Sequence, residues 1–351
     1  MKNLFIHKYA TISETLKQID KSGQRHLIVT EKNNKLLGVI ADGDLRRAIL
    51  KKKKLSSKIT NIFNKKPLFF YENDLLIKIA KRRMEEKGIF FAPIVNKNKI
   101  VVNFLNIIDN SSKKNTKKTK DRYPILIMAG GKGKRLEPFT SILPKPLIPI
   151  NDKTIIENII DTFIENNLNN FFISINFKGK IIESYFDDLK KNYKIKFVKE
   201  KKPLGTAGAI QFIRNQVKSN FFVTNSDIIL NIDYNDLIEF HKKNKNIITV
   251  VVAAKEYIIP YGSCEINQKG YLVKIKEKPS YNFLVSTGLY LFNKKIFKLI
   301  KKNEKLEMDK LIETAIKNDC KIMVYPTTEK SWIDVGQWDE YKKALEKLSF
   351  N

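Results

Sequence analysis

The N-terminal third of the chain repeats one order of hydrophobic and polar positions. Residues 26–50 (HLIVTEKNNKLLGVIADGDLRRAIL) place two short apolar runs on either side of a polar turn and then begin a helical pattern at ADGD. Residues 90–109 (FFAPIVNKNKIVVNFLNIID) repeat this order after an amphipathic helical pattern at 73–88. The pattern predicts two similar α+β units, each roughly β-β-α with an added helix.

A change of composition separates this region from the rest of the chain. Residues 111–122 (SSKKNTKKTKDR) contain no aliphatic residue and many lysines, so they cannot bury an apolar face and are expected to form an exposed linker. Beyond them, the apolar runs YPILIM (123–128) and FFVT (221–224) have the composition of strands buried in a parallel sheet. We therefore predict an α+β domain at 1–112, a linker at 113–122 and an α/β domain at 123–351.

Composition narrows the functional classes. The longest apolar run, IITVVVAA at 247–254, is far shorter than the ~18 residues of a membrane span, and the N-terminus lacks a signal-peptide core, so we expect a cytoplasmic protein without membrane contact. Lysine and arginine exceed aspartate and glutamate by 29, but the lysines are scattered and follow no nucleic-acid motif. A solvated basic surface is the better interpretation. Cys264 and Cys320 have no metal-ligand spacing and are expected to be ordinary thiols.

The most informative stretch follows the first predicted strand of the large domain. AGGKGKR (129–135) brings glycines, which let backbone N–H groups approach a phosphate, together with three cationic side chains. It is neither a Walker A loop nor a dinucleotide fingerprint, because no G-K-[ST] ends it and the third glycine of the fingerprint would fall at Leu136. From glycine spacing alone, a tight turn and a phosphate loop are equally good interpretations. Prolines on both sides of Lys145 restrict its backbone, which suits a fixed phosphate-binding lysine.

The whole string GGKGKRLEPFTSILPKPLIP (130–149) closely resembles the signature of sugar-1-phosphate nucleotidyltransferases, G-G-x-G-x-R-L-x-P-x-T followed by P-K-P-L. The resemblance implies a Rossmann-like, GT-A-like mixed sheet. It also implies that Arg135 grips the triphosphate and that Lys145 contacts phosphates near the transfer centre. The nucleotide-binding positions that it implies in this loop are Ala129, Gly130, Gly131 and Gly133.

Later motifs follow in the order of the same family. EKKPLGTAGAI (200–210) resembles its base and ribose loop, with Gly205 and Thr206 as nucleotide-binding residues. FFVTNSD (221–227) places Asp227 just after a strand, where the resemblance implies nucleotide and Mg²⁺ binding, and WIDVGQWDEY (332–341) supplies Asp334 as a second metal carboxylate. Taken singly, each motif also fits a helix start or a capping carboxylate. Their joint order favours the enzyme.

The resemblance places the sugar phosphate between these motifs. Tyr261-Gly262 and the E-K-P element imply that Glu277 holds sugar hydroxyls and Lys278 the sugar phosphate, with Gly262 nearby. STGLYLF (286–292) resembles the following N-A-G-I-Y strand, which brings Thr287 to the acceptor. A sugar-1-phosphate carries nearly two negative charges, so its oxygen needs no protein base to attack the α-phosphorus of a nucleoside triphosphate. Accordingly, none of the three histidines lies in a motif.

The N-terminal region resembles a tandem pair of cystathionine-beta-synthase-type (CBS) domains, most clearly at GVIADGDLRRAI. The resemblance implies self-association into a homo-oligomer and an adenine nucleotide held between the repeats, with Asp44 on the ribose hydroxyls. Capping of the helix that begins at ADGD is an equally good interpretation of Asp44. In the second repeat, Asn103 and Asn106 are taken to replace the usual threonine and aspartate.

The identities of the nucleotide base and of the sugar substrate are narrowed only by analogy with known enzymes. P-L-G-T-A-G resembles the loop of guanylyl-transferring members, and a CBS pair ahead of this domain resembles the glucosamine-1-phosphate guanylyltransferase of bacterial legionaminic acid biosynthesis. The implied reaction joins GTP to glucosamine-1-phosphate, giving GDP-glucosamine and pyrophosphate. Mannose-1-phosphate guanylyl transfer and uridylyl or thymidylyl transfer remain open. Alternatives of another class are a catalytically silent nucleotide sensor and a basic nucleic-acid binder.

Overall fold

The computed structural model describes residues 2–74, 76–106, 123–189, 191 and 193–348. They group into two compact units, one formed by residues 1–118 with 254–284 and the other by residues 119–253 with 285–351. The predicted boundaries instead assign 254–284 to the large domain, and those boundaries remain a prediction. The predicted linker, residues 113–122, lies outside the described residues.

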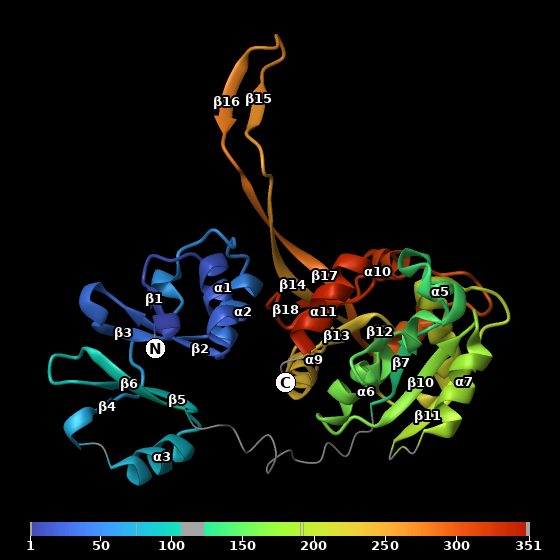
Figure 1. Cartoon of the computed structure of the whole chain (residues 1–351), viewed down its shortest axis with the longest axis horizontal. Helices are drawn as coiled ribbons and strands as arrows, with labels where there is room; N and C mark the ends of the chain where they lie inside the picture. Colours follow the sequence, from blue (N-terminus) through green and yellow to red (C-terminus); the bar gives the residue numbers. More distant parts are fainter. Residues whose placement is uncertain (1, 75, 107–122, 190, 192, 349–351) are drawn as a thin grey trace. The chain divides into compact units, whose positions relative to one another are not determined.

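Two three-stranded sheets form the N-terminal part of the first unit (Figure 1), in the orders β1-β2-β3 and β4-β5-β6. In each, the first pair of strands is parallel and the second antiparallel, so the predicted strand arrangement repeats. The helix predicted after the second hairpin lies outside the described residues. The elements are β1 (Phe5–His7), α1 (Ile12–Ser22), β2 (His26–Thr30), β3 (Leu36–Ala41), α2 (Asp42–Leu50), β4 (Phe70–Tyr71), α3 (Ile77–Glu86), β5 (Phe91–Val95) and β6 (Val101–Asn106).

The registers of the two hairpins correct one part of the predicted repeat. His26 pairs with Ala41 in the first sheet and Phe91 pairs with Asn106 in the second, and both hairpins shift register one residue before the first strand ends. Asn106 therefore corresponds to Ala41. The predicted equivalence of Asn106 with Asp44 is wrong by three residues, because the turn and the bulge fix a register that composition does not reveal.

The Asp44 side chain forms its hydrogen bonds at the start of its own helix, α2. Its Oδ2 accepts from the Ala41 backbone N–H at 2.9 Å and its Oδ1 accepts from Arg47 at 2.5 Å, as the capping interpretation predicts. A carboxylate in the first helical turn is also favoured by the helix dipole. Adenine nucleotide binding at Asp44 stays a prediction.

The second unit contains a seven-stranded mixed sheet in the order β11-β10-β7-β12-β17-β14-β18 (Figure 1). Strands β11, β10, β7 and β12 run parallel, β17 is antiparallel to β12, and β18 is parallel to β14. This confirms the predicted α/β mixed-sheet fold. The strands are β7 (Ile125–Met128), β10 (Asn170–Ile175), β11 (Lys194–Lys199), β12 (Asn220–Asn225), β14 (Ile248–Ile258), β17 (Ser280–Asn293) and β18 (Ile322–Thr327).

Short elements complete the chain. The helices are α5 (Phe139–Ile142), α6 (Ile155–Ile164), α7 (Gly179–Asp188), α8 (Gly205–Gly208), α9 (Tyr234–Lys243), α10 (Met308–Lys317) and α11 (Trp338–Leu348). Three two-stranded ladders pair β8 (Pro149–Ile150) with β9 (Lys153–Thr154), β13 (Ile228–Leu230) with β19 (Trp332–Asp334), and β15 (Ser263–Ile266) with β16 (Leu272–Lys276).

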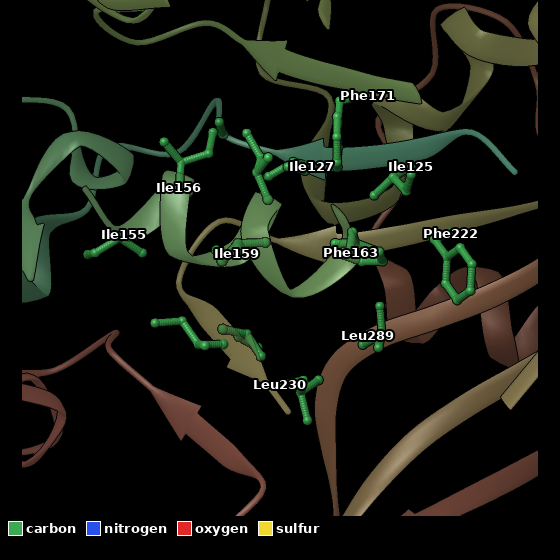
Figure 2. Close-up of a cluster of buried hydrophobic side chains, with 14 of the residues drawn as sticks. Ile125, Ile127, Ile155, Ile156, Ile159, Phe163, Phe171, Phe222, Leu230 and Leu289 are labelled. Carbon is green, nitrogen blue, oxygen red and sulfur yellow. The ribbon is translucent and has the colours of Figure 1, made fainter. Parts of the chain in front are cut away.

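The central strands β7, β10 and β12 of the large sheet are buried on both faces, which explains why they are almost continuously apolar, whereas the edge strand β11 is partly exposed. In β7, Ile125 and Ile127 join one hydrophobic cluster and Leu126 joins the other. Figure 2 shows the first cluster, where Ile159 and Phe163 of α6 lie among the side chains of the sheet. Alternate residues of a strand point to opposite faces, so a strand covered on both sides needs apolar side chains at every position.

Across the described part of the chain, no helix has the length and apolar character that a membrane crossing requires.

A buried histidine gives the second unit a testable acid sensitivity. His241 of α9 is 1% exposed, its Nδ1 lies 2.8 Å from Thr249 Oγ1, and burial lowers its pKa to about 4. Between pH 6.5 and about 4 the unfolded chain binds a proton at this residue that the folded chain does not, so stability falls as the pH falls through that window. The loss amounts to about 3 kcal/mol at most.

We expect His241→Gln to flatten this pH dependence. Denaturant unfolding at pH 7.5, 6 and 5, followed by tryptophan fluorescence, measures it in the second unit, because both tryptophans of the chain, Trp332 and Trp338, belong to that unit. The exposed His7→Gln variant is the control and should retain the wild-type slope. An unchanged slope in His241→Gln would contradict the assignment.

Candidate active site

A cleft of about 560 Å³ opens in the second unit where the parallel strands end. Strands β7, β12 and β11 are parallel members of one sheet, so the loops that follow their carboxyl ends meet at one edge, where α/β sheets bind ligands. Four cationic and three anionic side chains lie in the lining. The lining residues are Met128, Gly130, Gly131, Gly133, Lys134, Arg135, Lys145, Glu200, Pro203, Leu204, Gly205, Thr206, Asn225, Ser226, Asp227, Lys305 and Glu307.

The loop after β7 requires glycine at Gly133. Its φ of +68° lies in the left-handed region, and a Cβ there would come within 2.9 Å of both Lys145 Cβ and Thr140 Cγ2. The Thr140 hydroxyl donates to the Gly133 carbonyl at 3.1 Å, which fixes the turn from the other side. The absent side chain at 133 therefore leaves the space that Lys145 uses to enter the cleft.

Lys145 and Asp227 form the central contact of the cleft. The Lys145 Nζ donates to Asp227 Oδ2 at 2.5 Å, and the two side chains are only 10% and 16% exposed. Asp227 lies just beyond β12, and its backbone carbonyl accepts from the Val335 N–H at 2.9 Å. Because β13 pairs with β19 so that Ile228 faces Asp334, the two predicted metal carboxylates come from strand ends that are bonded to each other.

The absence of a side chain at Gly336 allows the charged groups of Lys145, Asp227 and Asp334 to come close together. A Cβ at Gly336 would lie 2.7 Å from Asp334 Oδ1, 3.1 Å from Asp227 Oδ2 and 3.3 Å from Lys145 Nζ, so three charged atoms surround one point. The Gly336 N–H also donates to Asp334 Oδ1 at 2.7 Å. Burial, reinforced by the Asp227 carboxylate, raises the pKa of Asp334, while Lys145 and Arg135 act in the opposite direction.

The donor set fits a magnesium ion that is shared with a substrate. Mg²⁺ is usually held by one or two protein carboxylates together with phosphate oxygens and water. Asp227 and Asp334 provide two carboxylates near one point, and the ammonium of Lys145 already places a cation against Asp227. Within the described residues, no group of three or more acidic, histidine or cysteine side chains forms a self-sufficient metal site.

Residues 306–308 form hydrogen bonds with the loop that carries Gly205 and Thr206. Glu307 accepts from the Thr206 backbone N–H at 2.9 Å and from its hydroxyl at 3.0 Å, which with the other hydrogen bonds at Glu307 lowers the pKa of that carboxyl. The Met308 N–H donates to the Thr206 hydroxyl at 2.8 Å. At Gly205, where φ is +81°, a Cβ would lie 2.6 Å from the Leu306 carbonyl. The Thr206 side chain is thus engaged within the protein.

Most of the predicted nucleotide residues meet in this cleft. Gly130, Gly131, Gly133, Arg135, Lys145, Gly205, Thr206 and Asp227 line it, and Asp334 adjoins it through Gly336. Ala129 is 1% exposed and does not line the cleft, and its N–H donates to the Ser174 carbonyl at 2.9 Å.

The predicted sugar residues are divided between the two units. Thr287 is fully buried, and its hydroxyl donates to the Val251 carbonyl at 3.0 Å because β17 turns this side chain toward β14. Gly262, Glu277 and Lys278 belong to the other unit. There, a Cβ at Gly262 would lie 3.2 Å from Glu277 Oε2, so these two residues are close neighbours. Their roles at the sugar phosphate stay predictions.

Sequence reasoning missed several residues of the cleft. Glu200 stands at the start of a motif that was recognised by its glycines, and Gly336 stands in W-x-D-x-G, so both had a signal in the sequence. Lys305 and Glu307 had none, because they come from a segment about a hundred residues beyond the loop that they contact.

Comparison with known proteins identifies the family of the domain that contains this cleft. The nucleotidyl transferase family model matches residues 125–350. The chain belongs to the nucleotidyl transferase family. The predicted enzyme class, nucleotidyl transfer to a sugar-1-phosphate, is thereby confirmed. A CBS-domain model matches residues 1–51, which confirms the first predicted repeat and leaves the second a prediction.

Several named relatives of this nucleotidyl transferase are guanylyltransferases, and others are bifunctional GlmU proteins, one of them 33% identical over 235 residues, from Methanocaldococcus jannaschii, covering 64% of this chain and 55% of that protein. This chain is 28% identical over 222 residues to the D-glycero-alpha-D-manno-heptose 1-phosphate guanylyltransferase of Campylobacter jejuni, covering 63% of this chain and 97% of that protein. It is 31% identical over 227 residues to the mannose-1-phosphate guanylyltransferase catalytic subunit beta of Dictyostelium discoideum, covering 63% of each. It resembles the crystal structure of HddC from Yersinia pseudotuberculosis with a TM-score of 0.52 and 26% identity, covering 64% of this chain and 99% of that one.

We expect Gly133→Ala to destabilise the second unit by about 2 kcal/mol or more, because the left-handed φ and the approach of Lys145 both oppose a methyl group. Thermal unfolding followed by tryptophan fluorescence measures this loss. Gly131→Ala is the matched control, since nothing lies within 4 Å of its Cβ position. Equal melting temperatures for the two variants would show that the turn does not require glycine at 133.

Proposed function

We propose that this nucleotidyl transferase transfers guanylyl from GTP to a sugar-1-phosphate and releases pyrophosphate. The observation that carries the proposal is the meeting of Arg135, Lys145 and Asp227 in one cleft of the matched domain. The guanine preference is supported by the names of the two guanylyltransferase relatives and by the HddC structure complexed with GMP-PN, which matches this chain with a TM-score of 0.50.

The residues of the cleft account for the reaction by charge and alignment. Two anions must be brought together, and the charge that develops on the bridging oxygens must be neutralised. Arg135 and Lys145 supply positive charge at the triphosphate, and Gly130 and Gly131 allow backbone N–H groups to approach it. Asp227 and Asp334 would hold Mg²⁺, which when bound neutralises phosphate oxygens. The Lys145 ammonium would be available to bind a phosphate oxygen once its ion pair with Asp227 is broken.

For the acceptor we propose glucosamine-1-phosphate. The order of a CBS region ahead of the transferase supports it, and so does the P-L-G-T-A-G loop, by resemblance to the enzyme of legionaminic acid biosynthesis. Mannose-1-phosphate is the second candidate, because the relative from Dictyostelium discoideum is named for it.

Pyrophosphate release tests both parts of the proposal, the choice of GTP and the choice of glucosamine-1-phosphate as the acceptor. The purified protein with Mg²⁺ is assayed with GTP, UTP, dTTP, CTP and ATP, each against glucosamine-, mannose-, glucose- and N-acetylglucosamine-1-phosphate. Release with GTP and glucosamine-1-phosphate supports the full proposal. Release with GTP and another sugar replaces the acceptor only, and a preference for another nucleotide overturns guanylyl transfer.

Asp227→Asn should keep the fold and lower turnover by about 10²-fold or more, because a neutral amide holds a metal ion and its phosphates far less well than a carboxylate. Turnover is measured at saturating substrates, with circular dichroism to check the fold. Asp187→Asn changes an exposed carboxylate of α7 and should leave turnover unaltered. Near-normal Mg²⁺-dependent turnover in Asp227→Asn would contradict the metal assignment.

A further inference from the structure

Residues 254–284 leave the large sheet as a long hairpin, which we call the arm. It consists of the last residues of β14, the β15–β16 ladder and the first residues of β17 (Figure 1). The arm groups with the N-terminal residues and not with the sheet that β14 and β17 join. It carries Gly262, Glu277 and Lys278, the residues predicted at the sugar phosphate. The contacts that hold the arm therefore bear on acceptor binding.

Most of the arm is exposed to solvent. Between residues 257 and 278, every residue except Ser263 is exposed, whereas residues 254–256 and Asn282 at the base of the arm are half-buried. A two-stranded ladder by itself is only marginally stable in water. The position of the arm therefore depends on the contacts at its base.

Helix α1 contacts both strands at this base. Lys17 forms an ion pair with Glu256 of β14, and the Ser13 hydroxyl donates to Asn282 Oδ1 of β17 at 2.9 Å. Ser13 and Lys17 are four residues apart, so they lie on the same face of the helix. Because β14 and β17 are neighbours in the sheet order, one face of α1 bridges two adjacent strands.

Another face of α1 is fixed in the N-terminal hydrophobic core. Ile12, Leu16 and Ile19 are each at most 8% exposed and belong to one buried cluster. Ala254, the first residue of the arm, packs against the same cluster. A capping box at Thr11 satisfies the backbone at the start of the helix. The helix is thus a firm support for the strands that it contacts.

Glu256 extends this contact toward the E-K-P element. The pKa of Glu256 lies below its usual value chiefly because Lys17 donates a hydrogen bond to the carboxylate, and a hydrogen bond from Ser280 acts in the same direction. Ser280 directly follows Pro279, so the strand that Glu256 contacts begins two residues after Lys278. The base of the arm and the predicted phosphate-binding lysine are therefore adjacent in the chain.

The backbone at Lys278 needs support from its surroundings. Its φ of +42° lies in the left-handed region, which a residue with a Cβ adopts only at a cost. The Ile259 N–H donates to the Pro279 carbonyl at 3.0 Å on one side, and on the other a Cβ at Gly262 would lie 3.2 Å from Glu277 Oε2. Such conformations persist where neighbouring contacts fix them, and they are concentrated at functional sites.

We propose that α1 positions the E-K-P element of the arm for binding of the sugar-1-phosphate. Ser13 and Lys17 fix the base of the arm, and this contact keeps the Lys278 ammonium in the orientation that binds the acceptor phosphate. The inference rests on the proposed function and on the predicted role of Lys278. Ser13 and Lys17 are positioning residues that act through the arm, so they affect the affinity for the acceptor and not that for the nucleotide.

Charge reversal at Lys17 tests the positioning role. Kinetics use the nucleoside triphosphate and the sugar-1-phosphate that release pyrophosphate fastest. Lys17→Glu places two carboxylates together, so we expect KM for the acceptor to rise by about 3- to 10-fold and KM for the nucleotide to change by less than about 2-fold. The double variant Lys17→Glu/Glu256→Lys restores an ion pair of opposite polarity and should return KM for the acceptor toward the wild-type value.

Lys21→Glu is the matched control, because it reverses an exposed lysine in the last turn of the same helix. It should leave both KM values unaltered. Lys278→Ala should raise KM for the acceptor by about 10-fold or more, since it removes a charged hydrogen-bond donor. The inference is overturned if Lys278→Ala or Lys17→Glu leaves KM for the acceptor unchanged, if Lys17→Glu raises both KM values equally, or if the double variant is no better than Lys17→Glu.

Hydrogen exchange of the full-length protein without substrates separates this inference from the proposed function. Faster amide exchange at 254–258 and 280–284 in Lys17→Glu than in Lys21→Glu supports the docking of the arm on α1, and equal exchange overturns it. Faster exchange with an unaltered KM for the acceptor overturns the positioning role alone. Absence of pyrophosphate release with every substrate pair overturns the proposed function, and the positioning role with it.

Discussion

One lysine ammonium and two carboxylates share a single end of the large sheet, and the cleft is organised around them. Lys145 contacts Asp227 at 2.5 Å, and Asp334 is brought alongside by the β13–β19 ladder. Removing one partner of such a buried pair leaves an uncompensated charge, at a cost of about 3–5 kcal/mol. The same arrangement is ready to receive other charges, because a metal ion can replace the ammonium at Asp227 and a phosphate can replace Asp227 at the ammonium.

The glycines of the cleft make this concentration of charge geometrically feasible. Gly133 leaves room for Lys145, and Gly336 leaves room for all three charged groups. They lie about two hundred residues apart, yet each solves the same problem of bringing charged side chains together without a Cβ in the way. The rigid sheet beneath them, apolar on both faces, fixes the strand ends from which these residues come.

The loop from Glu200 to Gly208 shows how a site acquires residues from distant parts of the chain. The backbone groups of Leu204 and Ala207 hydrogen-bond with Leu306, and Thr206 hydrogen-bonds with Glu307 and Met308, at the start of α10. Thr206 thereby has a supporting role inside the protein, and the Glu200 carboxylate accepts from the Leu204 N–H at the start of the loop. The lining of the cleft thus depends on packing between segments that no local motif connects.

The sequence by itself determined the fold class, the enzyme class and many of the residues that line the cleft. Continuous apolar runs identify strands buried on both faces, and the glycine, proline and lysine spacing of the 130–149 signature is local, so neither needs tertiary information. Only the tertiary structure decided the register that aligns Asn106 with Ala41, the burial of Thr287 between strands, and the entry of Glu200, Lys305 and Glu307 into the cleft. These features depend on strand pairing and on contacts between segments far apart in sequence, where a shift of one residue turns a side chain to the opposite face.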